Sequence, residues 1–154
     1  MKKQAETYEF TLERMFDASP ELTFDEMVDP KAQLEWWGGD GQIVRATCDL
    51  RVGGTATIEW GPSEVALIRT DQVFREIERP HRLVYAETVR QTGFPVYECL
   101  LTFTLVPVGD KTRITLNHTG FPTPEQRDIH QHGTGIFFDR LAKYLGRAKK
   151  PRRA

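Results

Sequence analysis

Residues 97–105 read YECLLTFTL, and the spacing of their apolar side chains decides the fold. Every second residue is apolar or aromatic: Tyr97, Cys99, Leu101, Phe103 and Leu105. The residues between them include Glu98, Thr102 and Thr104. Alternation with a period of two predicts a β-strand that has one buried face, and this face must pack against another element.

Strand-like sequence extends on both sides of this stretch, from residue 42 to residue 119. The segments are, in order, GQIVRATCDL, TATIEW, EVALIRTDQVFREIE, RLVYAETV, PVYECLLTFTLVPV and KTRITLNH. The breaks between them are short and built from turn formers such as RVGG, GPS and VGDK. Breaks of this length favour antiparallel hairpins. In the last segment Ile114, Leu116 and His118 share one face.

One more strand and two short helices precede this run. The segment YEFTLERMF places alternate residues on one face: Tyr8, Phe10, Leu12, Arg14 and Phe16. Ser19 and Pro20 then provide an N-cap and a first helical residue, and Asp29 and Pro30 repeat the device. We therefore expect two short helices, the second of which ends at the glycines after Trp37.

The chain closes with a predicted long helix. Thr123 can cap its start and Pro124 suits its first turn. Apolar residues recur at spacings of three, four and seven: Ile129, Ile136, Phe137, Leu141, Tyr144 and Leu145. Gly146 is the expected stop, and the basic residues 147–154 are expected to form a disordered tail.

Together these elements predict an α+β fold. A curved antiparallel sheet of about seven strands has one face to bury, and the long helix is the only element large enough to cover it. A helix of roughly 23 residues spans about 35 Å, which matches a strand of about ten residues. A curved sheet that grips a straight helix leaves a gap between them unless side chains fill it completely, so the space is either an internal cavity or a filled core.

Length and composition limit the function. The chain has 154 residues, which suits one domain over residues 1–154, and its net charge of -1 argues against a general nucleic-acid binder. No segment has the apolar length of a membrane span, and no secretion signal is visible, so we expect a cytoplasmic protein. Cys48 and Cys99 lack metal-ligand spacing and are expected to be reduced, buried thiols.

Several motifs resemble one known superfamily. RMFDASPELTF, the DP–LEWWG stretch, DLRVGG, EIERPHRLVYAET and LNHTGF occur in this order between about Tyr8 and Leu145. They resemble the START-like helix-grip superfamily (SRPBCC, birch-pollen-allergen-like). Within it, they are most similar to bacterial homologues of the C-terminal domain of the heat-shock-protein-90 ATPase activator (AHSA-like). This chain departs from the family at Gly135-Ile136, where members often have Gly-Trp, and at Asp71 and Gln72, where a glycine is common.

The resemblance implies a helix-grip fold around a hydrophobic pocket. Members of the superfamily use this pocket for lipids, sterols, polyketides and plant hormones, and some are polyketide aromatases and cyclases. Fold similarity alone does not assign a function.

The segment EWWGGDG at residues 35–41 has three possible functions: a phosphate loop, a base-stacking patch or an aromatic lid over the cavity. A phosphate loop needs glycines between a strand and a helix with a nearby lysine, whereas this segment follows a helix. Base stacking needs basic residues among the aromatics, whereas Glu35 and Asp40 are acidic. The lid remains, with one of Trp36 and Trp37 closing the core and the other facing a ligand.

Two polar residues fall on inward faces, and each has two interpretations. Arg14 requires a partner, either an acid such as Glu59 or Glu87 or the carboxylate or phenolate of a ligand. His118 is either a hydrogen-bonded structural residue or a general acid or base.

Residues 128–135 contain two histidines and two glycines, and each pair has two interpretations. His130 and His132 diverge on a helix, so we expect a surface helix turn rather than a metal site with Asp128. Gly133 and Gly135 either make room over the cavity or form a loop before the main helix.

The leading hypothesis is a binding protein for a hydrophobic or aromatic small molecule or a lipid, as a monomer or homodimer without cofactor or metal. The expected ligand-binding residues are Arg14, Trp36, Trp37, Trp60, Phe74, Tyr85, Tyr97, Phe103, His118, Phe137, Phe138 and Leu141. One alternative is a cyclase-like or hydrolase-like enzyme that uses Arg14 and His118; the lack of nucleophile–base or paired-carboxylate spacing favours binding over catalysis. Another is a co-chaperone-like or stress-response module that contacts a chaperone or other protein.

Overall fold

The computed structural model describes residues 6–148. Its elements are, in chain order, β1 (Tyr8–Phe16), α1 (Pro20–Val28), α2 (Pro30–Trp36), β2 (Ile43–Cys48), β3 (Thr55–Gly61), β4 (Ile68–Glu78), β5 (Arg82–Arg90), β6 (Glu98–Val108), β7 (Lys111–Phe121) and α3 (Pro124–Ala148). The predicted α+β helix-grip architecture is confirmed, with the two short helices after the first strand.

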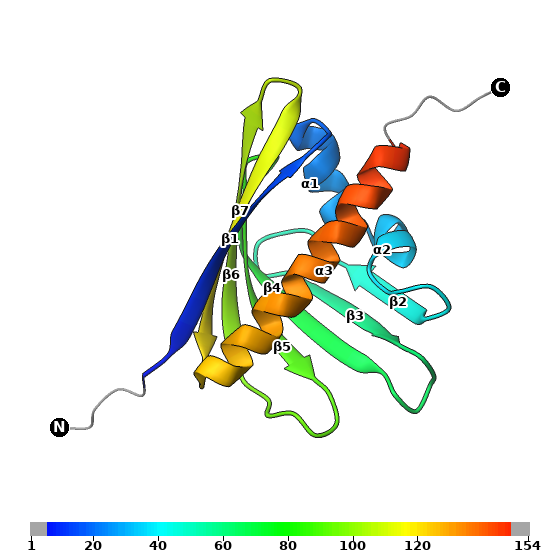
Figure 1. The fold of residues 1–154 in the computed structure, drawn as a ribbon, viewed down its shortest axis with the longest axis vertical. Helices are drawn as coiled ribbons and strands as arrows, with labels where there is room; N and C mark the ends of the chain where they lie inside the picture. Colours follow the sequence, from blue (N-terminus) through cyan, green and yellow to red (C-terminus); the bar gives the residue numbers. More distant parts are fainter. Residues whose placement is uncertain (1–5, 149–154) are drawn as a thin grey trace.

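The seven strands form one antiparallel sheet in the order β1-β7-β6-β5-β4-β3-β2. Only β1 departs from the sequential order, because it pairs with β7 at the far edge. The sheet is strongly curved, and α3 runs obliquely across its concave side, with α1 and α2 at one end (Figure 1). No helix within residues 6–148 has the length and apolar character needed to cross a membrane.

The strand register confirms the inward face that the alternation predicted. Cys99, Leu101, Phe103 and Leu105 are buried, while Glu98 is exposed. Tyr97 lies one residue before β6 and is only half-buried, although it still packs against the core. Cross-strand pairs therefore form continuous inward rows over the concave face, because neighbouring strands present side chains of paired residues on the same side.

Local sequence signals set the helix starts. The Ser19 hydroxyl accepts a hydrogen bond from the Leu22 amide at 3.2 Å, and the Asp29 carboxylate accepts one from Lys31 at 3.0 Å. At α3 the Thr123 hydroxyl accepts from the Gln126 amide at 3.1 Å. These side chains satisfy amides that a helix leaves unpaired in its first turn.

Two predicted boundaries were wrong. The strand expected from residue 64 begins at Ile68, because a turn precedes it in which the Ala66 amide donates to the Ser63 carbonyl at 3.0 Å. Of the two interpretations left open for Gly133 and Gly135, the loop is excluded, because both residues lie within continuous helix α3. Gly146 does not stop this helix, which extends to Ala148, and the rest of the predicted tail lies outside the described residues.

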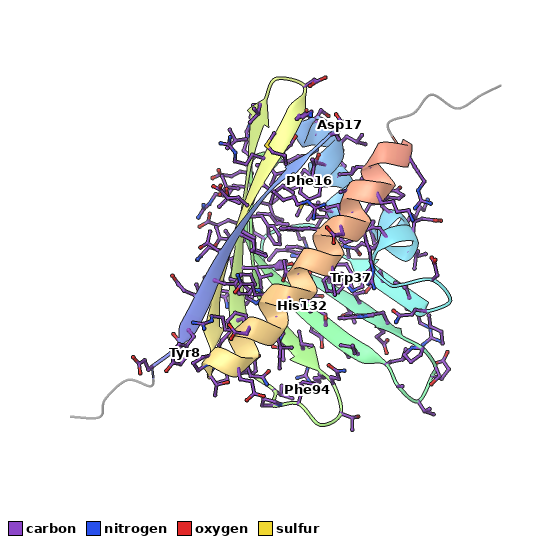
Figure 2. All side chains as sticks on the ribbon, viewed as in Figure 1. Tyr8, Phe16, Asp17, Trp37, Phe94 and His132 are labelled. Atoms are coloured by element: carbon purple, nitrogen blue, oxygen red, sulfur yellow. The ribbon has the colours of Figure 1, made fainter. Side chains whose placement is uncertain are left out.

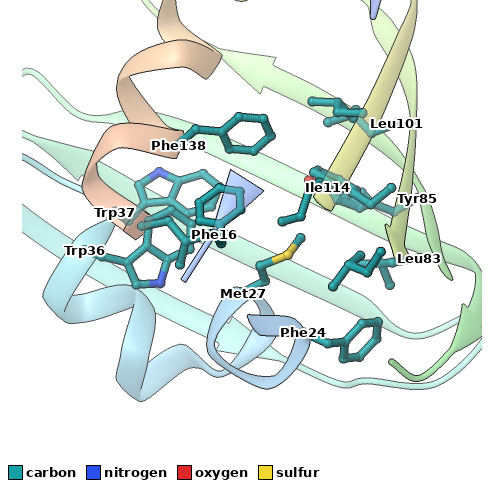
Figure 3. Packing of buried hydrophobic residues seen from close by; sticks show 14 of the residues in the cluster. Phe16, Phe24, Met27, Trp36, Trp37, Leu83, Tyr85, Leu101, Ile114 and Phe138 are labelled. Carbon is teal, nitrogen blue, oxygen red and sulfur yellow. The ribbon is translucent and has the colours of Figure 1, made fainter. Parts of the chain in front are cut away.

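One part of the hydrophobic core lies where α1, α2 and the C-terminal half of α3 meet the sheet. Phe16 of β1 packs edge-on against Phe138 of α3, with ring centroids 5.6 Å apart. Met27 points between these rings and the sheet residues (Figure 3). Phe24, Leu141 and Leu145 are almost fully buried in the same cluster. This end anchors α3 to the sheet.

Truncation at this anchor should be costly. Phe16 is 1% exposed, so Phe16→Ala should lower the free energy of unfolding by about 3–5 kcal/mol, since the lost contacts leave a void. Its neighbour Met15 is 41% exposed, so Met15→Ala should change the free energy of unfolding by less than about 1 kcal/mol. Urea unfolding followed by circular dichroism measures both, and equal losses for the two variants would contradict the assigned anchor.

Candidate functional site

A cavity of about 340 Å³ lies between the concave face of the sheet and α3. Its floor is made by inward residues of β3 to β7, and its roof by α3. The exposed lining residues Phe94, Ile129 and Ile136 mark its opening between the β5–β6 loop and the N-terminal half of α3. Figure 2 shows Phe94 in this loop, on the side of the molecule where α3 begins.

Aromatic rings form one end of the cavity. The ring centroid of Trp37 lies 4.8 Å from that of Phe137 and 5.6 Å from that of Trp60. Trp60 and Phe137 are themselves 5.8 Å apart in an edge-on contact. Because these rings come from α2's end, β3 and α3, only the folded chain brings them together. Such rings can make both edge and face contacts with a flat apolar ligand.

The two adjacent tryptophans have different roles. Trp36 is the last residue of α2, and its indole Nε1 donates to the Glu26 carbonyl at 3.0 Å, which ties α2 to α1. Trp37 caps the helix, and its buried Nε1 has no hydrogen-bond partner among the described residues. Both rings line the cavity. The glycines that follow let the chain turn into β2, as the lid hypothesis required.

Arg140 of α3 closes the aromatic end. Its guanidinium donates to the Trp37 carbonyl at 2.9 Å and lies over the Phe137 ring, 5.8 Å from the centroid. A cation at a helix C-terminus is favourable because it meets unpaired carbonyl groups there. This contact holds Trp37 beneath α3 and places a positive charge beside the aromatic rings.

A polar row crosses the floor of the cavity. Gln72 of β4, Glu87 of β5 and Cys99 of β6 are consecutive cross-strand partners. Glu87 is 8% exposed, and the only hydrogen bond of its side chain among the described residues is a long one of 3.4 Å from the Gln72 side-chain amide. Burial raises the pKa of Glu87 to about 7, an effect that the Gln72 hydrogen bond opposes. A carboxyl group that titrates near neutral pH thus faces the cavity.

Two histidines lie together beside this row. His118 is 2% exposed, and neither of its ring nitrogens has a hydrogen-bond partner among the described residues. Burial, with a contribution from nearby His130, lowers the pKa of His118 to about 3, so the ring is neutral at physiological pH. The interpretation of His118 as a hydrogen-bonded structural residue was therefore wrong.

His130 also differs from its prediction. Its ring centroid lies 5.8 Å from that of His118, and it is partly buried and lines the cavity rather than lying on a surface turn. His132 is exposed, as Figure 2 also indicates on the outside of α3. Within residues 6–148 no group of three His, Cys, Asp or Glu side chains could hold a metal ion.

Gly133 makes room in the roof of the cavity. It lines the cavity from the middle of α3, and a Cβ atom added to it would meet no atom within 4 Å. Glycine is unfavourable inside a helix by about 1 kcal/mol relative to alanine. The first of the two interpretations for this residue, space above the pocket, is the one that the structure supports.

Arg14 lies outside the cavity lining. It forms an ion pair with Asp139 of α3, and not with Glu59 or Glu87 as expected. The reason is topological: β1 is an edge strand, so the inward side of Arg14 meets the flank of α3 and remains 35% exposed. The other predicted site residues all line the cavity, namely Trp36, Trp37, Trp60, Phe74, Tyr85, Tyr97, Phe103, His118, Phe137, Phe138 and Leu141.

The prediction missed Gln33, Gln72, Glu87 and His130, which also line the cavity. One signal was readable in the segment RLVYAETV, where Glu87 occupies the same alternate positions as Leu83 and Tyr85. A glutamate on an otherwise apolar inward face predicts a buried carboxyl group.

Removing the Arg14 pair should have little effect. Asp139 is 67% exposed, and solvent screens such a pair, so Arg14→Gln should lower the free energy of unfolding by less than about 1 kcal/mol. Thermal and urea unfolding of the variant and the parent chain measure this. A larger loss would mean that the pair anchors α3, which the core at Phe16 and Phe138 is expected to do alone.

Glu87 should make stability depend on pH. The folded pKa of about 7 exceeds the ordinary value of 4.5, so the folded state binds the proton more tightly than the unfolded state does. The contribution of protonated Glu87 to the free energy of unfolding is therefore fully present below pH 4.5 and is lost as pH rises through 7. This change is on the order of 3 kcal/mol. Glu87→Gln removes this dependence.

As pH rises from 4.5 to 7, Glu87→Gln should thus become more stable relative to the parent chain, as measured by the difference in their free energies of unfolding. His118 has the opposite dependence, because its lowered pKa makes the fold lose stability as pH falls from 6.5 toward 3. It is present in both proteins and cancels in the difference. A difference that does not change with pH would contradict a buried, protonated Glu87.

Comparison with known proteins agrees with this architecture. A family model described as Activator of Hsp90 ATPase homolog 1-like protein matches residues 17–146, which is most of the chain. No curated protein matches.

Solved bacterial structures share the fold. The Mll3558 protein from Rhizobium loti is 28% identical with a TM-score of 0.77, and the match covers 91% of this chain and 98% of that one. Protein CV1439 from Chromobacterium violaceum is 21% identical with a TM-score of 0.76, over 89% and 96% of the two chains. CalU16 from Micromonospora echinospora is 18% identical with a TM-score of 0.67, over 89% and 75%. The last two show the fold alone; from the family match, this chain belongs to the Activator of Hsp90 ATPase homolog 1-like family.

Proposed function

We propose that this chain binds a small molecule with an apolar, at least partly aromatic body in the cavity between the sheet and α3. The observation that carries the proposal is the cavity itself, about 340 Å³ with aromatic rings at one end. Sites for small molecules are mostly apolar concavities of about 300–1,000 Å³ with a few polar groups that orient the ligand. This cavity has that size and composition.

Unpaired polar atoms support the same proposal. The indole Nε1 of Trp37 and both ring nitrogens of His118 are buried without a partner among the described residues. Buried polar groups normally form hydrogen bonds, and each unpaired one costs about 1–3 kcal/mol. Both residues line the cavity, so a ligand with hydrogen-bonding groups would offset this cost.

The enzyme alternative is less favoured in its predicted form. It relied on Arg14 and His118 acting on one substrate. In the pairing of β1 with β7, His118 is opposite Phe10. Arg14 lies four residues further along β1 than Phe10, so the two positions are about 13 Å apart along the strand. Arg14 is also paired with Asp139 outside the cavity. A binding function requires no such convergence.

The two helical glycines allow a matched test. Gly133 lines the cavity and Gly135 does not, and a Cβ atom at either meets no atom within 4 Å. Gly133→Leu should fill the roof and weaken binding of the neutral fluorophore N-phenyl-1-naphthylamine by about tenfold or more, since losing one buried contact corresponds to 1.4 kcal/mol or more. Gly135→Leu should leave binding unchanged. Fluorescence titration measures both affinities.

Both leucine variants should remain folded, because replacing a helical glycine favours the helix by up to about 1 kcal/mol. Circular dichroism and urea unfolding provide that control. If the parent chain shows no saturable binding, or if both variants bind it equally well, the cavity is not the binding site. A role in contacting a protein partner would then be the better hypothesis.

A further inference from the structure

Glu87 is a buried acid without a charge partner in the part of the chain that the structure describes. It is 92% buried on the floor of the cavity, and none of the ion pairs among the described residues includes it. The one hydrogen bond that its side chain forms within residues 6–148, from the Gln72 side chain, is 3.4 Å long, at the limit of such bonds. An isolated buried carboxyl group is unfavourable in either protonation state unless something else binds it. The fold retains it at a position that faces the cavity.

The groups around Glu87 do not supply a cation. Gln72 faces it from β4, Cys99 from β6 and Tyr85 from the same strand, and Tyr97 is near enough for repulsion. Burial is the main cause that raises the pKa of Tyr97 and of Cys99 to about 12, and the charge of Glu87 contributes to both shifts, so both groups stay neutral. From β7 and α3, burial lowers the pKa of His118 and of His130, so these rings are neutral as well. Within residues 6–148, therefore, no positive side chain pairs with Glu87.

The positive charge in the cavity wall lies at the other end. Arg140 is engaged with the Trp37 carbonyl and the Phe137 ring. Ala56 of β3 is in the same cross-strand row as Gln72 and Glu87. Trp60, at the aromatic end, lies four residues further along β3, which corresponds to about 13 Å. The cavity is therefore electrostatically polarised along its length. A cationic group is repelled from the aromatic end and attracted to the floor at Glu87.

We propose that the ligand carries a basic nitrogen, which pairs with Glu87 while its apolar or aryl end lies among Trp37, Trp60 and Phe137. This inference rests on the proposed binding function and specifies the chemical class of the ligand. An arylalkylamine with a chain of a few carbons has the required arrangement. A carboxylic acid of the same shape would meet repulsion from Glu87 at the floor.

Protons balance in either route of binding. An ammonium ligand enters with its proton, and the Glu87 carboxyl releases its own proton to solvent. A neutral amine instead takes the proton from Glu87 directly. Both routes end in the same pair, an N–H⁺ donor and a carboxylate acceptor, which is stronger than a hydrogen bond between neutral groups.

Three compounds of one shape test the proposal: 4-phenylbutylamine, 4-phenyl-1-butanol and 4-phenylbutanoate. Each displaces N-phenyl-1-naphthylamine from the parent chain and from Glu87→Gln, at pH 8. The amine should bind the parent chain about tenfold to a hundredfold more tightly than the alcohol, as expected for a charge-assisted hydrogen bond. In Glu87→Gln this preference should disappear, while the alcohol should bind as before.

The pH dependence of the unmutated chain provides a second measurement that needs no variant. As pH rises from 6 to 8, Glu87 should lose its proton. The ligand amine should keep its proton, because the ordinary pKa of an alkylamine is near that of lysine, about 10.4. The affinity for the amine should therefore rise, and the affinity for the alcohol should not. His118 stays neutral over this range, because burial lowers its pKa to about 3.

The outcomes separate the two proposals. Equal affinities for amine and alcohol, or an amine preference that survives Glu87→Gln, would overturn the assignment of a basic nitrogen but leave the binding function intact. Tightest binding of the butanoate, lost in Arg140→Gln, would overturn it in favour of an acid held by Arg140. Absence of binding by the fluorophore itself would contradict the binding function.

Discussion

The packing of α3 on the sheet is the interaction on which the rest of this structure depends. Its C-terminal half is anchored, with Phe138, Leu141 and Leu145 buried against the sheet and the two short helices. Its N-terminal half covers the cavity, and there Ile129 and Ile136 are partly exposed and Gly133 faces open space. A straight helix can follow a curved sheet closely over only part of its length, so a firm contact at one end leaves room at the other. The cavity follows from this geometry.

Polarity within the cavity is arranged along the same axis. Arg140 and the indole of Trp37, which has no partner among the described residues, place hydrogen-bond donors at the aromatic end. Glu87 and the neutral His118 lie on the floor formed by the central strands. Burial shifts the pKa values of these two groups in opposite directions, because it disfavours the charged form of each. Low dielectric in this space also makes each unpaired group more consequential for the choice of ligand than it would be on a surface.

The site was predictable from the sequence in its apolar part and only partly in its polar part. The aromatic lining residues, such as Phe103 and Phe137, followed from alternation on strands and from helical spacing. Arg14 was correctly placed on an inward face but given the wrong partner, because pairing with Asp139 depends on β1 being at the sheet edge beside α3. His130 was assigned to the surface since spacing along a helix does not say which side the sheet occupies. Glu87 carried a readable signal in its strand.

The sequence by itself determined the elements, their order and the inward face of the strands, because caps, turn residues and periodicity act over a few neighbouring positions. That local information also sufficed for the α+β architecture and the family resemblance. Only the tertiary structure decided which polar residues meet. The row of Gln72, Glu87 and Cys99 is assembled from three strands, and the contact of His118 with His130 joins β7 to α3. These juxtapositions depend on sheet register and curvature, which arise from the packing of the whole chain and have no local counterpart in the sequence.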